Sequence, residues 1–202
     1  TLTDFIEWGV ASMPAENYAL VLWNHGGGID GIAWDDTSGD HLSIAELDAA
    51  MASVSADIDV LGFDACLMAS AEVMHAVGDS VSYFVASQEL EGGDGWDYRD
   101  LLNDLAAQGE TMTPRGFAHA TVDSARDDAA ISTLSAIDTA TTDAFATALR
   151  GFTDTAMAIA TASDWNVMSA ARDSADVFYN SAFRDLGDFL TSVTTGNVSA
   201  AL

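Results

Sequence analysis

Basic residues are scarce in this sequence. Among 202 residues there are six Arg and no Lys against 32 acidic residues, which gives a net charge of −26. A surface this negative repels the phosphates of nucleic acids and of anionic membranes. No apolar stretch approaches the roughly 20 residues that a membrane-spanning helix requires. We therefore expect neither nucleic acid nor a membrane as a partner.

The acidity itself requires an explanation, because self-repulsion at this charge density destabilises a compact fold in dilute buffer. At about 1 M salt the Debye length falls to about 3 Å, and this repulsion is largely screened. The chain is rich in Asp and in small residues and has no Lys. Such a composition is typical of proteins from organisms that accumulate salt. The composition thus predicts a halophilic source, and we expect an archaeon. The carboxylates then serve solvation, and their number alone does not indicate a substrate.

Cysteine is almost absent as well. Cys66 is the single cysteine, so the chain has no internal disulfide and no metal site built from several cysteines. Hydrophobic residues make up 49% of the chain, which is enough for one full-sized core. No internal repeat and no low-complexity linker is visible. We therefore expect one domain over residues 1–202.

Hydrophobic periodicity predicts strands that alternate with helices. Expected strands are 18–24, 58–63, 83–87 and 130–136, and expected helices are 3–12, 44–53, 66–77, 98–107 and 113–126, followed by helical segments broken near Asp164 and Gly187. The segment 25–42 is expected to be a loop, and a Ser43/Glu46 capping box is expected to open the helix after it. This order predicts an α/β fold with a mainly parallel sheet and helices on both faces.

Functional sites in such sheets lie beyond the C-terminal ends of the strands, which here are His25, Cys66 and residues 88–94. The glycine-rich run 26–31 matches G-x-G-x-x-G, a weak signal for dinucleotide binding because Asp30 would face the pyrophosphate. The run HGGG also occurs in lipases, but the chain lacks their G-x-S-x-G nucleophile motif. A generic ligand-binding domain that uses this run as an anion loop is a distant alternative.

A third interpretation pairs His25 with Cys66, which end two strands separated by one crossover. At the start of the helix expected over 66–77, the Cys66 thiolate would be favoured. It would attack a carbonyl carbon while His25 moves the protons. The N–H groups of Gly26 and Cys66 would bind the oxyanion. Taken singly, a lone Cys is more often a small core residue and a lone His a structural one; together at strand ends they favour catalysis.

Four blocks carry a resemblance to a known family. They are YALVLWNHGGG (18–28), DDTSGDHLSIAEL (35–47), GFDACLMASAEV (62–73) and YFVASQELEGGDGWDY (83–98). In this order they resemble the clostripain family of cysteine peptidases, which belongs with caspases, gingipains and legumain. Beyond residue 100 the likeness is general. The resemblance implies a caspase-like three-layer sandwich whose catalytic motifs lie in residues 18–98.

The resemblance also assigns roles. It implies that His25 is the general acid/base, that Cys66 is the nucleophile, and that cleavage follows Arg or, as a second choice, Lys. Asp64, two residues before the Cys, would bind the basic side chain of a protein or peptide substrate, and Asp94 would be a second pocket acid. A carboxylate can bind a guanidinium through two hydrogen bonds. As alternatives, Asp64 is a helix N-cap residue and Asp94 a turn residue.

Some features depart from the family pattern. The first basic residue is Arg99, so we do not expect self-cleavage after a basic residue between His25 and Cys66. The family's first strand is missing, so we expect a fragment; secretion or a cell-surface location is implied by the resemblance alone. The runner-up function is a catalytically inactive caspase-like module that binds peptides or protein partners.

No cofactor is expected. Residues 35–46 superficially resemble a calcium-binding EF-hand loop, with Asp35 first and Glu46 twelfth. However, Asp40 stands where that loop needs glycine, and a capping box explains Glu46 without a metal. Calcium binding by this loop therefore stays an open alternative.

Overall fold

The computed structural model describes residues 1–126 and 128–196 of the chain. Two compact units are present, Thr1–Thr142 and a second one that begins at Asp143. The predicted catalytic motifs all lie in the first unit, which is built around a four-stranded sheet. The expectation of one domain remains a prediction.

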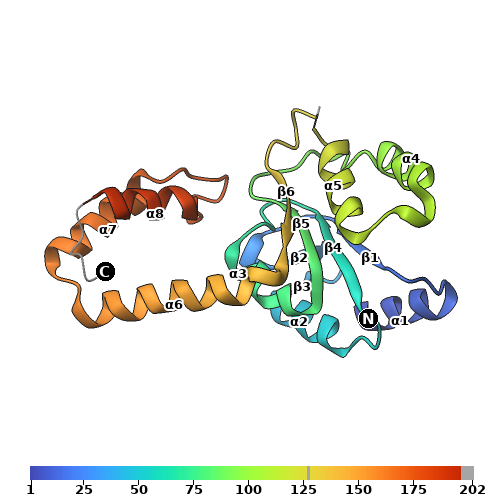
Figure 1. Ribbon diagram of the computed structural model, residues 1–202, viewed down its shortest axis with the longest axis horizontal. Coiled ribbons are helices and arrows are strands. Elements are labelled where there is room, and N and C mark those ends of the chain that lie inside the picture. Colours follow the sequence, from blue (N-terminus) through green and yellow to red (C-terminus); the bar gives the residue numbers. More distant parts are fainter. Residues whose placement is uncertain (127, 197–202) are drawn as a thin grey trace. The chain divides into compact units, whose positions relative to one another are not determined.

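The sheet has the strand order β1 (Ala19–Trp23), β4 (Ile58–Asp64), β5 (Val81–Ser87) and β6 (Leu134–Asp138) (Figure 1). The first three strands are parallel, as predicted for 18–24, 58–63 and 83–87. The fourth begins four residues later than expected and runs antiparallel to β5. The sheet is therefore mainly parallel, with one antiparallel strand at its edge.

Helices cover both faces of this sheet. The helices α1 (Leu2–Ser12), α2 (Ile44–Ser53) and α3 (Ala71–Val77) share one core cluster with Leu61, Phe63 and Phe84. The other face packs Val60 and Val85 against α5 (Pro114–Ser124), and α5 in turn contacts α4 (Tyr98–Gln108). Neighbouring strand residues thus point to opposite layers, as the pleat requires. The predicted three-layer α/β architecture is confirmed.

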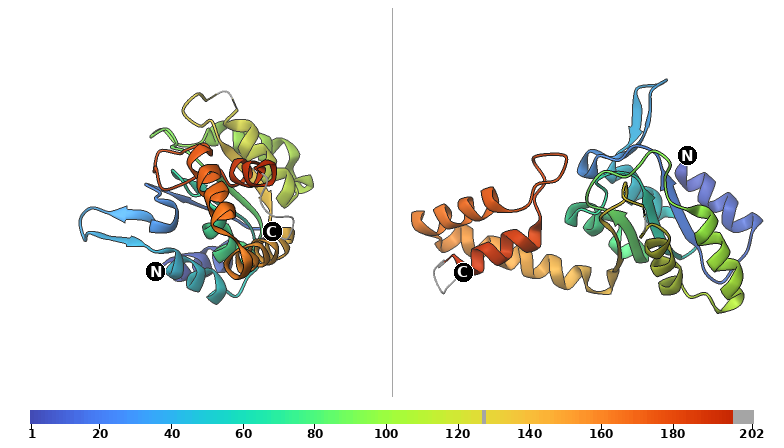
Figure 2. Two further views of the ribbon diagram at one scale, coloured as in Figure 1. Left: turned by 90° about the vertical axis from the view of Figure 1, so that its left-hand side faces the viewer. Right: turned by 90° about the horizontal axis from the view of Figure 1, so that it is seen from above.

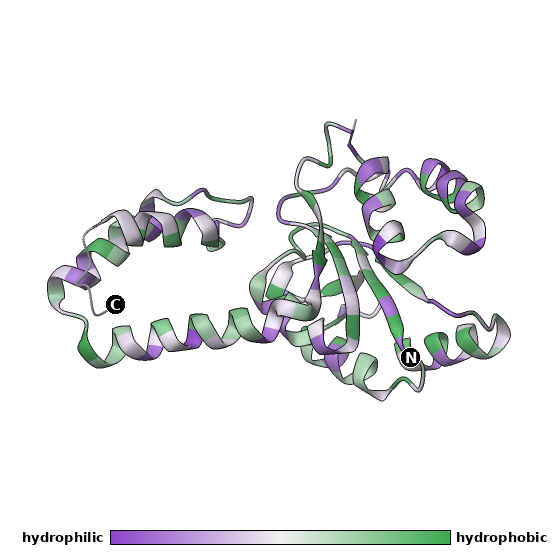
Figure 3. Ribbon diagram, in the orientation of Figure 1, coloured by the Kyte–Doolittle hydropathy of each residue, from purple (hydrophilic) through white to green (hydrophobic). Residues whose placement is uncertain are grey.

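Hydrophobic residues predominate along the strands of the sheet, while the helices carry both hydrophobic and hydrophilic residues (Figure 3). The predicted capping box at the start of α2 is present: Ser43 accepts from the Glu46 N–H, and the Glu46 side chain accepts from the Ser43 N–H. Short 3₁₀ turns lie at Gly28–Asp30, Gly78–Ser80, Gly109–Thr111 and Thr139–Thr141.

Part of the loop expected over 25–42 is a hairpin, so that expectation was wrong. β2 (Ile32–Asp35) pairs antiparallel with β3 (Asp40–Leu42), and the hairpin projects from the rest of the first unit (Figure 2). The rings of Trp34 and His41 stack across it, with centroids 5.0 Å apart. The many turn-forming residues concealed these short strands.

The helix expected over 66–77 was wrong at its start. Residues 65–70 form a turn, and α3 begins at Ala71 with Ser70 as its N-cap. Leu67 has a φ of +65°, a conformation that a leucine rarely adopts and that cannot continue a right-handed helix. Cys66 therefore does not stand at a helix N-terminus, and Asp64 is not a helix N-cap.

The second unit is helical. Its helices are α6 (Thr142–Ile159), α7 (Ala162–Ser174) and α8 (Leu186–Thr195), with a small core of Ala156, Met168, Ala171 and Val193. The break expected near Asp164 lies at 160–161, and Gly187 stands in the first turn of α8. In the described ranges no helix is both long and apolar enough to cross a membrane.

Candidate active site

His25 and Cys66 follow paired residues at the same edge of the sheet. Trp23 of β1 and Asp64 of β4 are partners in the parallel register. His25 and Cys66 each stand two residues further along, so the two segments leave neighbouring strands side by side. The histidine side chain is exposed and the cysteine side chain is half-buried. The strand register thus brings the predicted dyad to one crevice-forming edge.

Gly26 packs directly against the cysteine turn. A Cβ atom placed on Gly26 would lie 2.2 Å from the carbonyl oxygen of Cys66, so no side chain fits there. Gly26 also stands opposite Ile32 in an antiparallel bridge whose flanking hydrogen bonds use Gly27 and His25. In such a pair the N–H of Gly26 points away from its partner. That N–H is therefore left for another acceptor.

The cysteine turn is held by the segment that follows β5. Ala69 N–H donates to the Ser87 carbonyl (2.9 Å), and Leu67 N–H donates to the Glu89 carbonyl (3.1 Å). The sulfur of Cys66 accepts from the N–H of Glu91 at 3.3 Å and lies 3.8 Å from the Glu91 carbonyl oxygen. The left-handed conformation of Leu67 is thus fixed by two strand-like hydrogen bonds, as is common for strained residues in functional sites.

Asp64 is a buried carboxylate, 3% exposed, at the end of β4. Its Oδ2 accepts from the backbone N–H of Trp96 (3.1 Å) and from the hydroxyl of Tyr98 (2.7 Å). The backbone at Gly95 passes so close that a Cβ there would lie 2.6 Å from Oδ2. Gly95 also has a φ of +71°, so glycine is required on both counts. The turn-rich run after β5 thus folds back over Asp64.

Glu91 is the acidic side chain that faces Asp64. Its Oε2 accepts from the indole N–H of Trp96 at 3.2 Å. Burial, and next the charge of Asp64, raise the pKa of Glu91 from its usual 4.5 to about 8. Burial and the hydrogen bond to Asp64 also raise the pKa of the Tyr98 hydroxyl.

Asp94, predicted as the second pocket acid, is exposed on the turn. The side chain of the run EGGDGWDY that faces Asp64 is Glu91, which the sequence did not single out; the role of Asp94 stays a prediction. Which of the two folds inward depends on the path of the turn, which spacing does not give.

A model of the peptidase C11 family, described as the clostripain family, matches residues 1–194. The chain belongs to the clostripain family. Clostripain from Hathewaya histolytica is 31% identical over 130 residues, covering 54% of this chain and 24% of clostripain. The chain thus spans about a quarter of the length of that relative.

Solved structures agree on the fold of this clostripain-family chain. A secreted C11 cysteine protease from Bacteroides thetaiotaomicron, in complex with an irreversible peptide inhibitor, is 20% identical with a TM-score of 0.68. The alignment covers 95% of this chain and 56% of that one. An inactive zymogen C11 protease from Parabacteroides distasonis is 20% identical with a TM-score of 0.69, covering 96% and 57% of the two chains. The match shows the α/β sandwich of C11 proteases.

The glycine-rich run does not have the surroundings of a dinucleotide-binding loop. Residues 26–31 lead into a 3₁₀ turn and then into β2, not into the helix that a dinucleotide-binding loop requires. Within residues 1–126 and 128–196, no group of three or more His, Cys, Asp or Glu side chains is arranged to hold a metal ion. Calcium binding by residues 35–46 remains a prediction.

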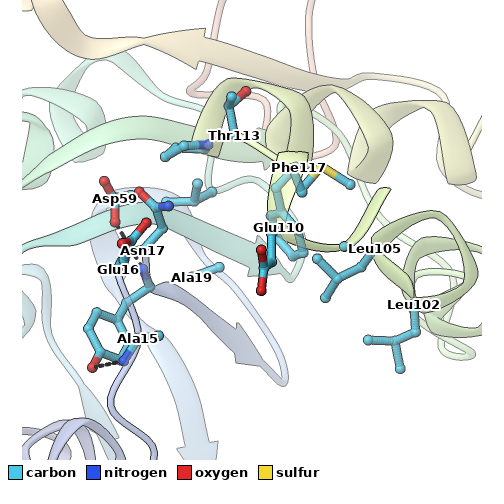
Figure 4. A pocket seen from close by; sticks show the side chains of 15 residues that line it. Ala15, Glu16, Asn17, Ala19, Asp59, Leu102, Leu105, Glu110, Thr113 and Phe117 are labelled. Carbon is cyan, nitrogen blue, oxygen red and sulfur yellow. Dashed lines mark hydrogen bonds between the residues drawn. The ribbon is translucent and has the colours of Figure 1, made fainter. Parts of the chain in front are cut away.

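A large cavity lies at the other edge of the same sheet. It has a volume of about 840 Å³ and is lined by residues that include Tyr18, Asp59, Leu105 and Phe117. Figure 4 shows side chains from the start of β1 and from α4 and α5 around it. Tyr18 and Asp59 stand at the N-terminal ends of β1 and β4. The cavity is therefore separate from the edge that carries His25 and Cys66.

Proposed function

We propose that the protein is a cysteine endopeptidase that hydrolyses peptide bonds after Arg, with Lys as a second choice. The observation that carries the proposal is the register of β1 and β4, whose paired ends Trp23 and Asp64 each stand two residues before His25 and Cys66. Membership of the clostripain family supports this chemistry. Proteins or peptides with a basic residue before the cleaved bond are then the substrates.

In the proposed reaction the Cys66 thiolate attacks the carbonyl carbon of the cleaved bond, and a C–S bond forms. The N–H groups of Gly26 and Cys66 stabilise the negative oxygen of the tetrahedral intermediate. The C–N bond then breaks, and His25 gives its proton to the leaving amine. Water, deprotonated by His25, then attacks the thioester carbon. A C–O bond forms, the C–S bond breaks, and the Cys66 thiolate and the protonated His25 are restored. The close packing of Gly26 on the Cys66 turn supports this arrangement.

Recognition of the basic side chain is assigned to Asp64. Its carboxylate lies next to the Cys66 turn and is fixed by Trp96 and Tyr98, so it is preorganised to accept a guanidinium. Trp23, 63% exposed, lies beside Gly95 at the same strand end, and its indole offers a face for a cation. The role of Asp94 in the pocket remains a prediction. We also propose export, because a structural neighbour is described as secreted.

The test is covalent labelling with an arginyl acyloxymethyl-ketone probe, read by intact mass. The protein is kept in about 3 M KCl, where screening is nearly complete. We expect one adduct, lost in Cys66→Ala and reduced in Asp64→Asn. A citrullinyl probe of the same shape but without the charge is the matched control, and it should label weakly. Better labelling by a lysyl or an aspartyl probe would retain the peptidase and overturn the preference for Arg.

Absence of labelling by every probe, on folded protein with reduced Cys66, would refute the peptidase proposal. The runner-up function, an inactive caspase-like module that binds peptides, would then apply. Binding of an arginyl peptide without cleavage, measured by calorimetry, would identify that case.

A further inference from the structure

Glu91 lies next to both the proposed nucleophile, Cys66, and the proposed substrate-binding acid, Asp64. Its backbone N–H donates to the sulfur of Cys66, and its side chain faces the buried carboxylate of Asp64. Neither contact was expected from the sequence. A residue placed in this way links the nucleophile with the pocket for the basic side chain.

Hydrogen-bond donors are too few for two carboxylates. Tyr98 and the backbone of Trp96 donate to Oδ2 of Asp64, and the Trp96 indole donates to Oε2 of Glu91. Oε1 of Glu91 is buried and has no hydrogen-bond donor at normal geometry within the part of the chain that the structure describes. The backbone N–H of Ala65 lies near this carboxyl group and lowers its pKa, but burial and Asp64 raise the pKa by more. An ionised carboxylate oxygen left in this state would be costly. A proton on Oε1 removes the cost, because the resulting O–H can donate to Asp64.

Among the described residues, no positive charge lies close enough to compensate this pair. The titratable groups that face Glu91 are Asp64 at the end of β4, Tyr98 at the start of α4, and the thiol of Cys66 beside its backbone. The ion pairs of the described residues involve Asp4, Asp123 and Asp173, none of which belongs to the site. Two adjacent carboxyl groups without a cation cannot both ionise near neutral pH.

We propose that Glu91 keeps its proton beside Asp64 in the free enzyme, and that a substrate guanidinium displaces this proton when it enters the pocket. Glu91, instead of Asp94, is then the second acid that determines specificity. This inference rests on the proposed function, since it requires a basic side chain in the pocket. The raised pKa of Glu91, caused first by burial and next by Asp64, agrees with it.

In the binding step, the substrate guanidinium replaces the proton of Glu91, so the positive charge of the site is conserved. The free site carries one negative charge and one proton, and the substrate brings one positive charge. The O–H bond of Glu91 breaks, its proton goes to the solvent, and the guanidinium lies between two carboxylates. Affinity for Arg therefore rises as the pH rises, because protons compete less for the pair.

The test compares an arginyl and a citrullinyl peptide on the full-length protein between pH 6 and 8. The ratio of their kcat/KM values cancels the ionisation of Cys66 and His25, which acts on both substrates alike. With a pKa of about 8 for Glu91, the ratio should rise on the order of 50-fold over this range. In Glu91→Gln the ratio should be lower at pH 8 and independent of pH.

Two further variants test whether Glu91 or Asp94 is the second acid that determines specificity. Asp104→Asn removes an exposed carboxylate of α4 and should keep the wild-type rise. If Asp94→Asn flattens the profile while Glu91→Gln keeps it, the proposal is overturned in favour of Asp94. A ratio that favours Arg equally at each pH overturns the displaced proton of Glu91 but retains the peptidase. Loss of the preference for Arg at every pH, or of all cleavage, refutes the proposed function itself.

A binding measurement removes the dependence on turnover. Titration of the protein with agmatine at pH 7, in buffers of different ionisation enthalpy, reports the protons released per ligand. We expect about one proton for the wild type, as for any group whose pKa falls from above to below the working pH. Glu91→Gln should release none. Binding of agmatine to the wild type without proton release would overturn the proposal.

Discussion

Substitution of Gly26 by Ala tests the contact between the two catalytic segments. The added Cβ would lie 2.2 Å from the Cys66 carbonyl oxygen, whereas carbon–oxygen contacts are normally no closer than about 3.3 Å. The segments must therefore separate by about 1 Å. A displacement of this size in a catalytic site can cost on the order of 100-fold in rate. Strain of this kind costs about 1–3 kcal/mol of stability.

The measurement is kcat/KM on an arginyl peptide together with the melting temperature. We expect a folded Gly26→Ala protein with slightly lowered Tm and kcat/KM reduced by about 100-fold. Gly93→Ala is the matched control, because its Cβ would meet no atom within 4 Å; it should change neither value. An unchanged kcat/KM in Gly26→Ala would refute the packing of Gly26 on the Cys66 turn.

Three further results are expected. Tyr98→Phe removes a hydroxyl that donates to Asp64 at 2.7 Å; a loss of about 1.5 kcal/mol lowers Tm by about 3–6 °C, and an unchanged Tm would contradict the bond. Between its usual pKa of 4.5 and the raised value of about 8, Glu91 is protonated in the fold but ionised in the unfolded chain. The Tm of wild type should therefore fall relative to that of Glu91→Gln as the pH rises through this window; parallel Tm profiles would exclude the raised pKa. With a net charge of −26, Tm should fall as KCl is lowered below about 1 M; a Tm indifferent to KCl would contradict the halophilic interpretation.

Much of the fold was predictable because its signals are local. The apolar runs that became β1, β4 and β5 stand between turn-forming residues, and a crossover between parallel strands makes them neighbours. That topology alone places His25 and Cys66 at one edge. The capping box of Ser43 and Glu46 was predictable for the same reason, since its spacing is fixed by the first helical turn.

The errors arose where distant contacts override local preference. CLMASAEVMHAV has helical periodicity, yet its first residues bond to the segment after β5 and hold Leu67 at a φ of +65°. The hairpin over 32–42 contains turn-forming residues that conceal its two short strands. Glu91 lies inside a glycine-rich turn whose path depends on a hydrogen bond from Trp96 to Asp64. None of these contacts is encoded within a short window of sequence.

The buried carboxylate of Asp64 has two roles: it is proposed to bind the substrate's basic side chain, and it holds the turn that carries Glu91. The same oxygen that organises the turn, by accepting from Trp96 and Tyr98, belongs to the carboxylate proposed to receive the substrate's charge. That turn also carries Glu91, whose backbone N–H reaches the sulfur of Cys66. Removing the acceptor with Ala would therefore disturb the nucleophile as well as the pocket. Asn keeps an oxygen acceptor and removes the charge, so it isolates recognition from folding.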